Sequence, residues 1–169
     1  LKAAGASNLS VNFNNRGVDQ PYKVVGTWMV DQWKKIGVNT KQRVQPSPQF
    51  YATLRKKKDF DVSIDFNCQS VVNPIADITK FLGSAGNNYG QYEDAELEGI
   101  YDKILKSPDP KQTRALIRQY EKRALSDQAH LLVSLWWYKI NPYRSYVKGW
   151  KTSPSHYLNQ SLDNIWLDK

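Results

Sequence analysis

The sequence has one cysteine, one methionine and two histidines among its 169 residues. A single cysteine, Cys68, excludes an internal disulfide bond and a metal site built from cysteines. The histidines, His130 and His156, are far apart in the chain, and neither lies at a metal-ligand spacing. We therefore predict no metal and no cofactor.

The sequence also has no apolar run approaching the roughly 20 residues that are needed to cross a bilayer. Its first residues lack the charged start and the apolar core of a secretion signal, so any export signal is expected outside this sequence. It contains no internal repeat and no low-complexity stretch. At this length, a hydrophobic content of 40% is sufficient for one compact domain with a core of its own.

Acidic residues are fewer than basic ones: the sequence has 24 lysines and arginines and 16 aspartates and glutamates, which gives a net charge of +8. The excess is spread along the chain, apart from the run Arg55–Lys58. That run ends a predicted helix, where cations complement the helix dipole and the last carbonyl groups. A stand-alone basic module that binds nucleic acid or another anion remains the alternative interpretation of this charge.

The first part of the chain alternates between strand and helix patterns. The predicted elements are a strand at 9–13, a turn at Asn14–Gly17, a helix at Tyr22–Lys35, a strand at 38–44, a short helix from Ser47 through the basic run, and a strand at 60–66. The apolar stripe of the long helix, from Val24 to Ile36, is expected to face the core. Alternation of this kind favours an α/β fold whose sheet has parallel neighbouring strands.

The second part of the chain is predicted to be mainly helical before it returns to strands. The predicted elements are a helix at Pro74–Leu82, a polar loop at Gly83–Gln91, a helix at Asp94–Leu105, a helix from Asp109-Pro110 to about Asp127, a buried strand at Leu131–Ile140 and a pairing segment at Tyr143–Val147. The remainder, from Lys148 to Lys169, has little regular pattern and is expected to pack on another part of the protein.

The stretch from Asp59 to Asn73 is the strongest candidate for function. Alternating residues predict a half-buried strand, and a loop of small or polar residues follows it. Such a strand and loop can present an aromatic ring and uncharged hydrogen-bonding groups to a small molecule. The candidate ligand-binding residues are Phe66, Asn67, Cys68, Gln69 and Ser70.

Five stretches, in this order, resemble the C-terminal lobe of the family 5 bacterial solute-binding proteins, which are the oligopeptide- and dipeptide-binding components of ABC importers. The stretches are QPYKVVGTWMVDQWKKIGVNTKQRV, LRKKKDFDVSIDFN, NPIADITKFLGS, NNYGQYEDAELEGIYDKI, and LLVSLWWYKINPYRSYVKGW with NIWLDK. The resemblance implies an α/β fold with a mixed β-sheet flanked by helices, one lobe of a two-lobed periplasmic binding protein-like fold. Residues 1–147 would form this ligand-binding lobe, and residues 148–169 would be a tail packing on a missing N-terminal lobe.

The resemblance also implies a function. Such a receptor is not an enzyme: it closes around a solute between two lobes, outside the cytoplasm, and delivers the solute to an ABC permease in the membrane. The expected partners are therefore the solute, the permease and the N-terminal lobe of the same protein, with no nucleic acid. The expected state is a monomer.

Carried over residue by residue, the resemblance places Phe66 at a tryptophan position, Cys68 at an alanine and Gln69 at the aspartate that pairs with a peptide's amino group. Ser63 falls where some peptide binders have an arginine. Both charged anchors are thus absent at these positions, which disfavours a peptide with a free amino group relative to a typical member of the family. The expected solute is peptide-like, an amide or sugar-like, and Asn67, Gln69 and Ser70 would suit its neutral polar groups. Second candidates are the turn residues Asn14, Asn15 and Arg16 and the rings of Trp136, Trp137 and Tyr138.

One further alternative is a small hydrolase that uses Cys68 as its nucleophile. A catalytic thiol needs an identifiable activating neighbour, and the sequence supplies none beside it. Thiol alkylation that leaves every activity unchanged would remove this alternative.

Overall fold

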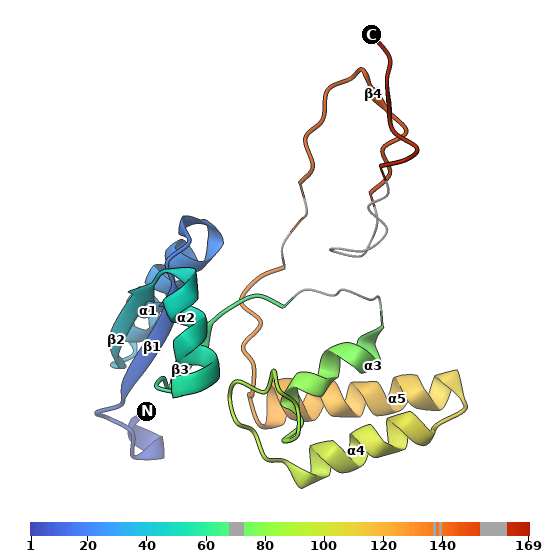
Figure 1. Cartoon of the computed structure of the whole chain (residues 1–169). Helices are drawn as coiled ribbons and strands as arrows, with labels where there is room; N and C mark the ends of the chain where they lie inside the picture. The colour runs from blue at the N-terminus through green and yellow to red at the C-terminus, as the bar shows by residue number, and fades with distance from the viewer. Residues whose placement is uncertain (68–72, 137, 139, 153–161) are drawn as a thin grey trace. The chain divides into compact units, whose positions relative to one another are not determined.

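A computed structural model describes residues 1–67, 73–136, 138, 140–152 and 162–169 of the chain (Figure 1). The chain divides into two compact units, which we call unit 1, Leu1–Asn67, and unit 2, Cys68–Lys169. Each unit has its own secondary structure and its own buried residues, so each is described by itself.

Unit 1 is built on a three-stranded parallel sheet. The strands are β1 (Ser10–Arg16), β2 (Asn39–Gln45) and β3 (Val62–Ile64), in the order β2-β1-β3. In the ladder Phe13 of β1 lies opposite Gln42 of β2 and Val62 of β3, and both pairings are parallel. The predicted α/β alternation with parallel neighbours is therefore confirmed.

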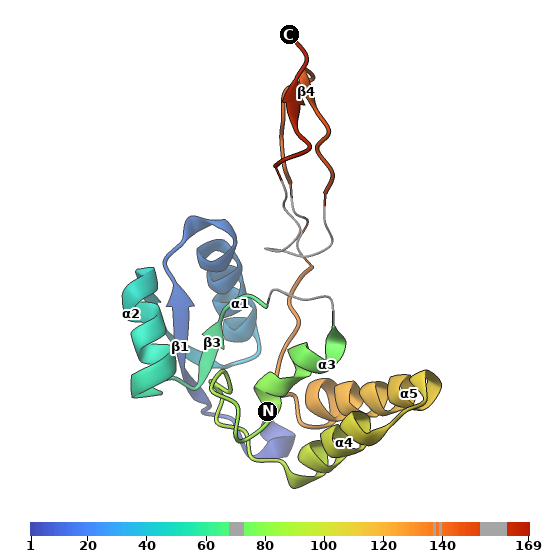
Figure 2. The same ribbon diagram turned by 45° about the vertical axis from the view of Figure 1, so that its right-hand side comes forward.

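The helices of unit 1 cover both faces of this sheet. They are a short 3₁₀ turn (Lys2–Ala4), a π-helical turn (Asp19–Lys23) that leads into α1 (Val24–Lys35), and α2 (Ser47–Ala52), which continues as a second π-helical turn (Thr53–Lys57). Helices α1 and α2 lie on opposite sides of β1 (Figure 2). This is the arrangement that right-handed crossovers produce when strands are added on both sides of a first strand.

The alternation of side chains along β1 determines which of them contact α1 on one face of the sheet and which contact α2 on the other. Phe13 is completely buried, and its ring packs edge-on against Trp33 of α1 at a centroid distance of 5.5 Å. Phe50 and Leu54, from α2 and the turn after it, are the other large apolar side chains at the centre of unit 1. The core of unit 1 therefore combines a ring of the central strand with apolar side chains from the helical segments.

Two predictions for unit 1 are wrong in detail. Along the stripe of α1 that was expected in the core, Val24, Trp28 and Ile36 are exposed, because the helix contacts the sheet through Gly26 and the half-buried ring of Trp33 instead. The predicted strand at 60–66 is shorter than its alternation indicates. Only Val62–Ile64 pair with β1, opposite Phe13, Asn14 and Asn15.

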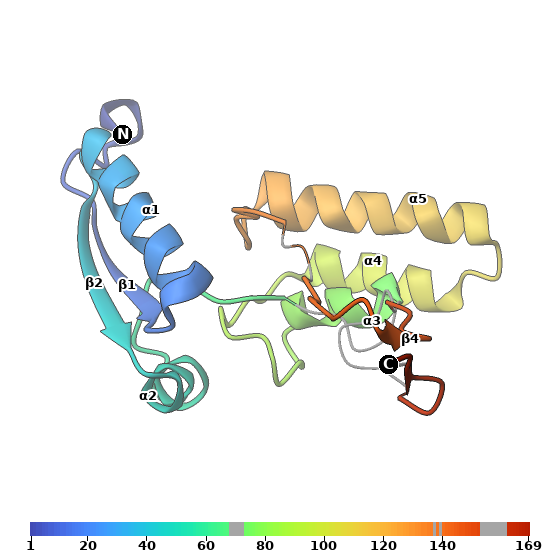
Figure 3. The same cartoon turned by 90° about the horizontal axis from the view of Figure 1, so that it is seen from above.

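Unit 2 contains a helical part and a two-stranded ribbon. The helices are α3 (Pro74–Asp77) with the 3₁₀ turn Ile78–Phe81, α4 (Ala95–Lys106) and α5 (Pro110–Glu121) with the π-helical turn Lys122–Asp127. Helices α4 and α5 run side by side (Figure 3). The ribbon pairs β4 (Val147–Lys148) with β5 (Trp166–Leu167) in antiparallel register.

Local capping chemistry explains where these helices begin. Asn73, Asp94 and Asp109 each accept a hydrogen bond from a backbone N–H in the first turn of α3, α4 and α5. Behind the caps, one apolar cluster joins the three helices; it comprises Ile78, Phe81, Leu82, Leu97, Ile100, Ile104, Tyr120 and Ala124. The buried Tyr120 hydroxyl donates to the carbonyl of Ile78 at 2.8 Å, which ties α5 to the turn after α3.

Two predictions for unit 2 are also wrong. The described residues of Leu131–Ile140 form no strand and are largely exposed: Trp136 at 89%, Tyr138 at 85% and Ile140 at 82%. A strand needs a neighbouring strand for its backbone hydrogen bonds, and no described residue pairs with this segment. Leu105, expected on the inner side of its helix, is exposed as well.

Candidate functional site

The site lies where β1 and β3 end. Because β2 and β3 are added on opposite sides of β1, the strand order reverses at β1. Ligands of open α/β sheets bind at the carboxyl ends of the strands at such a point. Arg16 is the last residue of β1, and Asp65 and Phe66 follow β3 directly. The topology therefore brings these three side chains to the edge of the sheet where a ligand is expected.

Arg16 is held by one hydrogen bond and three aromatic rings. Its Nε donates to Ser47 Oγ at 2.9 Å. Its guanidinium carbon lies 5.0 Å from the ring centroid of Tyr22, 5.4 Å from that of Tyr51 and 5.7 Å from that of Phe66. Rings at these distances attract the cation through their quadrupoles and shield it from water. We call Arg16, Tyr22, Tyr51, Asp65 and Phe66 the arginine cage.

Asp65 is the acidic member of the arginine cage. It accepts a hydrogen bond from the Tyr51 hydroxyl at 3.3 Å. Burial raises the pKa of the Asp65 carboxyl above its ordinary value, and hydrogen bonds from the Phe66 backbone and Tyr51 and the charge of Arg16 oppose that rise. Burial and the nearby Asp65 also raise the pKa of Tyr51 to about 12, so its hydroxyl stays protonated at neutral pH.

The structure corrects the predicted turn at Asn14–Gly17, because Asn14, Asn15 and Arg16 belong to β1. Asn15 is fully buried, and its side chain is hydrogen-bonded within the protein. Its amide nitrogen donates to the carbonyls of Arg16 and Tyr22, and its amide oxygen accepts from Gln42. Asn14 is buried on the same face of the sheet as Arg16. Its amide nitrogen donates to Ser63, and its amide oxygen has no hydrogen-bond partner among the described residues.

The other predicted site residues are spread over the chain. Phe66 is 43% exposed, and Asn67 is exposed at the end of unit 1. Trp136 and Tyr138 belong to unit 2 and are exposed there. Cys68, Gln69, Ser70 and Trp137 lie outside the described residues. The structure thus brings Arg16 and Phe66 together, while the part that the other residues play in binding stays a prediction.

Sequence reasoning missed Tyr22, Tyr51 and Asp65 as members of the arginine cage. The sequence contained one signal for Asp65, because Ser63 and Asp65 lie on the same polar face of the predicted strand. Tyr22 and Tyr51 gave no signal of this kind. Each lies in a helical segment that reaches the cage through tertiary packing of unit 1.

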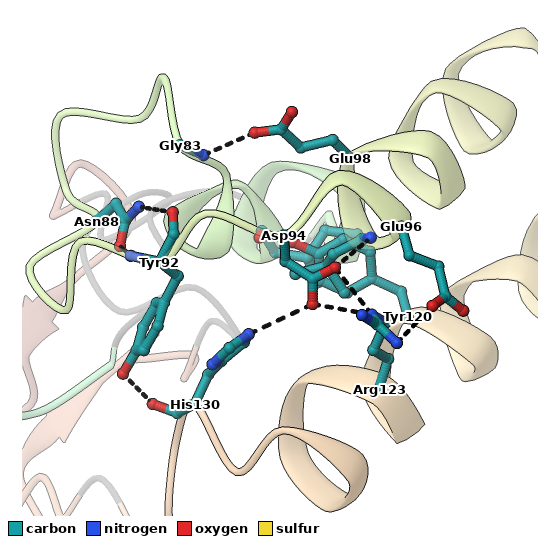
Figure 4. Close-up of polar contacts among 11 residues, drawn as sticks. Gly83, Asn88, Tyr92, Asp94, Glu96, Glu98, Tyr120, Arg123 and His130 are labelled. Atoms are coloured by element: carbon teal, nitrogen blue, oxygen red, sulfur yellow. Dashed lines mark hydrogen bonds and ion pairs between the residues drawn. The ribbon is translucent and has the colours of Figure 1, made fainter.

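Unit 2 has a polar cluster around Asp94, shown in Figure 4. Its carboxylate caps α4 and accepts two hydrogen bonds from Arg123 Nε at 2.8 and 2.9 Å, which hold the pKa of Asp94 below its usual range. Arg123 also pairs with Glu96 at 2.5 Å, and His130 Nε2 lies 3.6 Å from Asp94. All of these groups bind one another and connect α4 to the turn that follows α5. The cluster therefore has a structural role, and we call it the Asp94 joint.

Other kinds of site find little support. Within the described ranges, no three His, Cys, Asp or Glu side chains gather as metal ligands would. None of the helices in the described part of the chain is long and apolar enough to span a membrane. An open groove of about 720 Å³ in unit 2, lined by Pro74, Pro108, Arg114 and Arg118 among others, holds no buried polar group.

Several solved structures of binding proteins contain a part whose fold is similar to that of this chain. DppA from Helicobacter pylori, a periplasmic binding protein solved with the peptide STSA, aligns with a TM-score of 0.79 and 19% identity over 100% of this chain and 33% of its own. The oligopeptide transporter's substrate-binding domain from Bacillus anthracis aligns with a TM-score of 0.68 and 21% identity over 76% of this chain and 25% of its own.

A third similar structure is the oligopeptide-binding protein AppA from Bacillus subtilis, solved with a nonapeptide. It aligns with a TM-score of 0.68 and 17% identity over 95% of this chain and 32% of its own. The chain therefore spans between a quarter and a third of these three proteins. No protein-family model matches the chain, and no curated protein matches it in sequence. At these identities the likeness establishes the fold, and the predicted fold class is confirmed.

Proposed function

We propose that this chain is one lobe of a solute receptor that serves an ABC importer. The arginine cage carries the proposal, because it places a cation and three rings at the carboxyl ends of β1 and β3. The fold supports it as well, since two of the similar proteins named above are binding proteins of ABC transporters and two were solved with peptides. The solute would be peptide-like or another small polar molecule.

The geometry of Arg16 indicates how it meets the solute. The aromatic rings lie around the guanidinium, and its Nε donates to Ser47. Among the described residues the two terminal amino groups have no hydrogen-bond partner, so they would bind an oxygen acceptor of the solute. A carboxylate or another planar pair of oxygens would match that edge bidentately. The ring of Phe66, which is partly exposed, would pack against the apolar part of the same solute.

The remaining features of the proposal follow from the class of protein. The receptor binds and releases its solute without chemical change, works outside the cytoplasm and passes the solute to a membrane permease. Residues 1–147 form the ligand-binding lobe, residues 148–169 pack on the second lobe, and the complete receptor is a monomer. Cys68, Gln69, Ser70, Asn67, Trp136 and Trp137 with Tyr138 complete the cleft.

The experiment uses the complete polypeptide that carries this chain. Thermal-shift screening against dipeptides, tripeptides, amides and sugars, followed by calorimetry, should find a class that raises the melting temperature. Arg16→Gln should weaken binding of that solute by about tenfold or more, as loss of a charge-assisted hydrogen bond costs about 1.5–3 kcal/mol. The control is Arg114→Gln, an exposed arginine of α5, which should leave binding unchanged.

Two results would contradict the proposal. One is a wild-type receptor that no solute of the panel stabilises, although it is folded by circular dichroism. The other is tight binding to nucleic acid that weakens steeply with salt, since that behaviour belongs to a basic nucleic-acid module.

A further inference from the structure

Lysine side chains of unit 1 gather at the edge of the sheet opposite to the arginine cage. Because the three strands are parallel, each helix between them runs back from the carboxyl edge of the sheet to the amino edge (Figure 2). At the amino edge α1 ends in Lys34 and Lys35, and the π-helical turn after α2 ends in Lys56 and Lys57. Lys41, near the start of β2, adds a fifth charge. We call these five lysines the basic edge.

The charges of the basic edge are not neutralised within the protein. All five lysines are exposed, and in the described part of the chain none of them forms an ion pair with a carboxylate. The two aspartates at the same edge have other partners, since Asp59 pairs with Arg43 at 2.7 Å and Asp61 accepts hydrogen bonds from Asn12. Even with Asp31, one turn earlier in α1, positive charge prevails. The helix dipoles supply only about half a negative charge at each helix end, so this edge is left with charge for a partner.

Exposed aliphatic side chains accompany these lysines. Ile36 directly follows Lys34 and Lys35 at the end of α1 and is 62% exposed. Leu9 is 39% exposed at the same edge, where its carbonyl accepts a hydrogen bond from the N–H of Asn39 at the start of β2. Lysines around aliphatic side chains are typical of protein surfaces that bind an anionic bilayer. In such surfaces the lysines contact the headgroups, and the aliphatic groups enter the boundary with the acyl chains.

The residue types favour a lipid surface over nucleic acid. Lysine carries a compact charge on a flexible stem, which suits a diffuse layer of phosphates, whereas sites that recognise single phosphates or nucleic acid favour the planar fork of arginine. The arginines nearest to the basic edge are already engaged, Arg43 with Asp59 and Arg55 with the ring of Tyr51 at 4.9 Å. Single-stranded nucleic acid is usually bound by stacking on aromatic rings as well, and no member of the basic edge is aromatic.

We propose that the basic edge is a contact surface for a membrane that contains anionic phospholipids, with the lysines on the phosphate groups and Ile36 inserted among the headgroups. This inference goes beyond the proposed function and does not depend on any solute. Because the basic edge lies opposite to the arginine cage in unit 1, the contact leaves the carboxyl edge of the sheet accessible. A receptor held in this way would stay close to a permease while its solute site remains free.

Vesicle binding by the complete polypeptide tests this inference. Vesicles that contain phosphatidylglycerol are compared with vesicles of phosphatidylcholine alone by sedimentation at low salt. The wild type should bind the anionic vesicles only, and most of this binding should be lost at about 1 M salt, where the Debye length is about 3 Å. Each lysine near such a surface is expected to change the affinity about fivefold. The double variants Lys34→Gln with Lys35→Gln and Lys56→Gln with Lys57→Gln should therefore each weaken binding by about 25-fold.

Two matched controls separate this surface from the overall charge. Lys103→Gln with Lys106→Gln removes the same charge from exposed positions in the last turn of α4 and should leave vesicle binding nearly unchanged. Ile36→Ser should weaken vesicle binding about fivefold, because insertion removes part of the isoleucine side chain from water. Its control is Val24→Ser at the opposite end of α1, where the valine is 53% exposed and no effect is expected. Circular dichroism verifies the fold of each variant.

Several outcomes would overturn the inference without affecting the proposed function. One is a wild type that binds neither kind of vesicle, or both equally. Another is equal weakening by the α4 control and by the variants of the basic edge, because the net charge alone would then act. A DNA duplex that binds more tightly than the anionic vesicles, with an affinity that Ile36→Ser leaves unchanged, would assign the edge to nucleic acid instead. Solute binding should be the same in Lys56→Gln with Lys57→Gln as in wild type, so the two proposals are tested separately.

Discussion

The side-chain amide of Asn15, in β1, occupies the space that a Cβ at position 26 of α1 would need. A Cβ built on Gly26 would overlap the amide oxygen of Asn15 and would lie 2.7 Å from its Cγ and 3.2 Å from Cε1 of Phe13. Asn15 cannot move aside without losing its hydrogen bonds to Arg16, Tyr22 and Gln42. The glycine therefore lets α1 approach the strand that ends in the arginine cage.

Gly26→Ala should destabilise unit 1, because the added methyl group must displace either α1 or the buried amide. Overpacking of this kind costs about 1–3 kcal/mol. The matched control is Gly99→Ala in α4, where a Cβ would meet nothing within 4 Å. There the helix propensity of alanine should add about 0.5–1 kcal/mol of stability. Urea denaturation monitored by hydrogen exchange in each unit would measure both, and equal effects of the two substitutions would refute the steric argument.

Asp94→Ala should loosen the helical part of unit 2. The substitution removes the cap of α4, which costs about 1–2 kcal/mol for an N-cap carboxylate, and it leaves Arg123 without its principal partner. Hydrogen exchange should accelerate in the first turn of α4 and at the end of α5. Asp102→Ala, at an exposed position of the same helix, is the control. Unchanged exchange in Asp94→Ala would show that the cluster in Figure 4 does not join the helices.

Lowering the pH should weaken the contacts between Asp94 and Arg123 and so destabilise the helical part of unit 2. Because hydrogen bonds from Arg123 hold the folded-state pKa of Asp94 below its ordinary value, the folded state binds fewer protons here than the unfolded state. The stabilisation is therefore complete above the unfolded pKa of about 3.9 and is lost as the pH falls through the folded pKa. Unfolding curves between pH 2 and pH 6 should slope less steeply in Asp94→Asn than in wild type, and parallel curves would exclude Asp94 as the source.

Local chemistry was sufficient to predict much of this fold. The Asn73-Pro74 and Asp109-Pro110 pairs mark the starts of α3 and α5, because a capping side chain and a proline act within one helical turn. The strand and helix periodicities of unit 1 predicted a parallel sheet for the same reason. These features depend on residues that are neighbours in the chain.

Features that depend on distant residues were not predictable. The apolar segment Leu131–Ile140 has the composition of a buried strand, but whether it pairs depends on a neighbour that its own residues do not specify. Likewise, Tyr22, in the turn before α1, and Tyr51, in α2, reach Arg16 only through the tertiary packing of unit 1. The resemblance to peptide binders directed attention to positions 63 and 69, whereas the charges that the structure brings together are at positions 16 and 65.

Asp65→Asn should make the protein more stable at neutral pH while it impairs solute binding. Burial raises the folded-state pKa of Asp65, so the folded state binds more protons than the unfolded state between the two pKa values, and the wild type loses stability as the pH rises through that window. The advantage of Asp65→Asn should consequently be absent below about pH 3.9, where both states of the wild type are protonated, and complete above the folded pKa. Urea unfolding at pH 3 and pH 7.5 measures this difference. A lower stability of Asp65→Asn at pH 7.5 would mean that the carboxylate supports the fold of unit 1, whereas higher stability with weaker binding is the trade-off expected of a residue that serves a ligand.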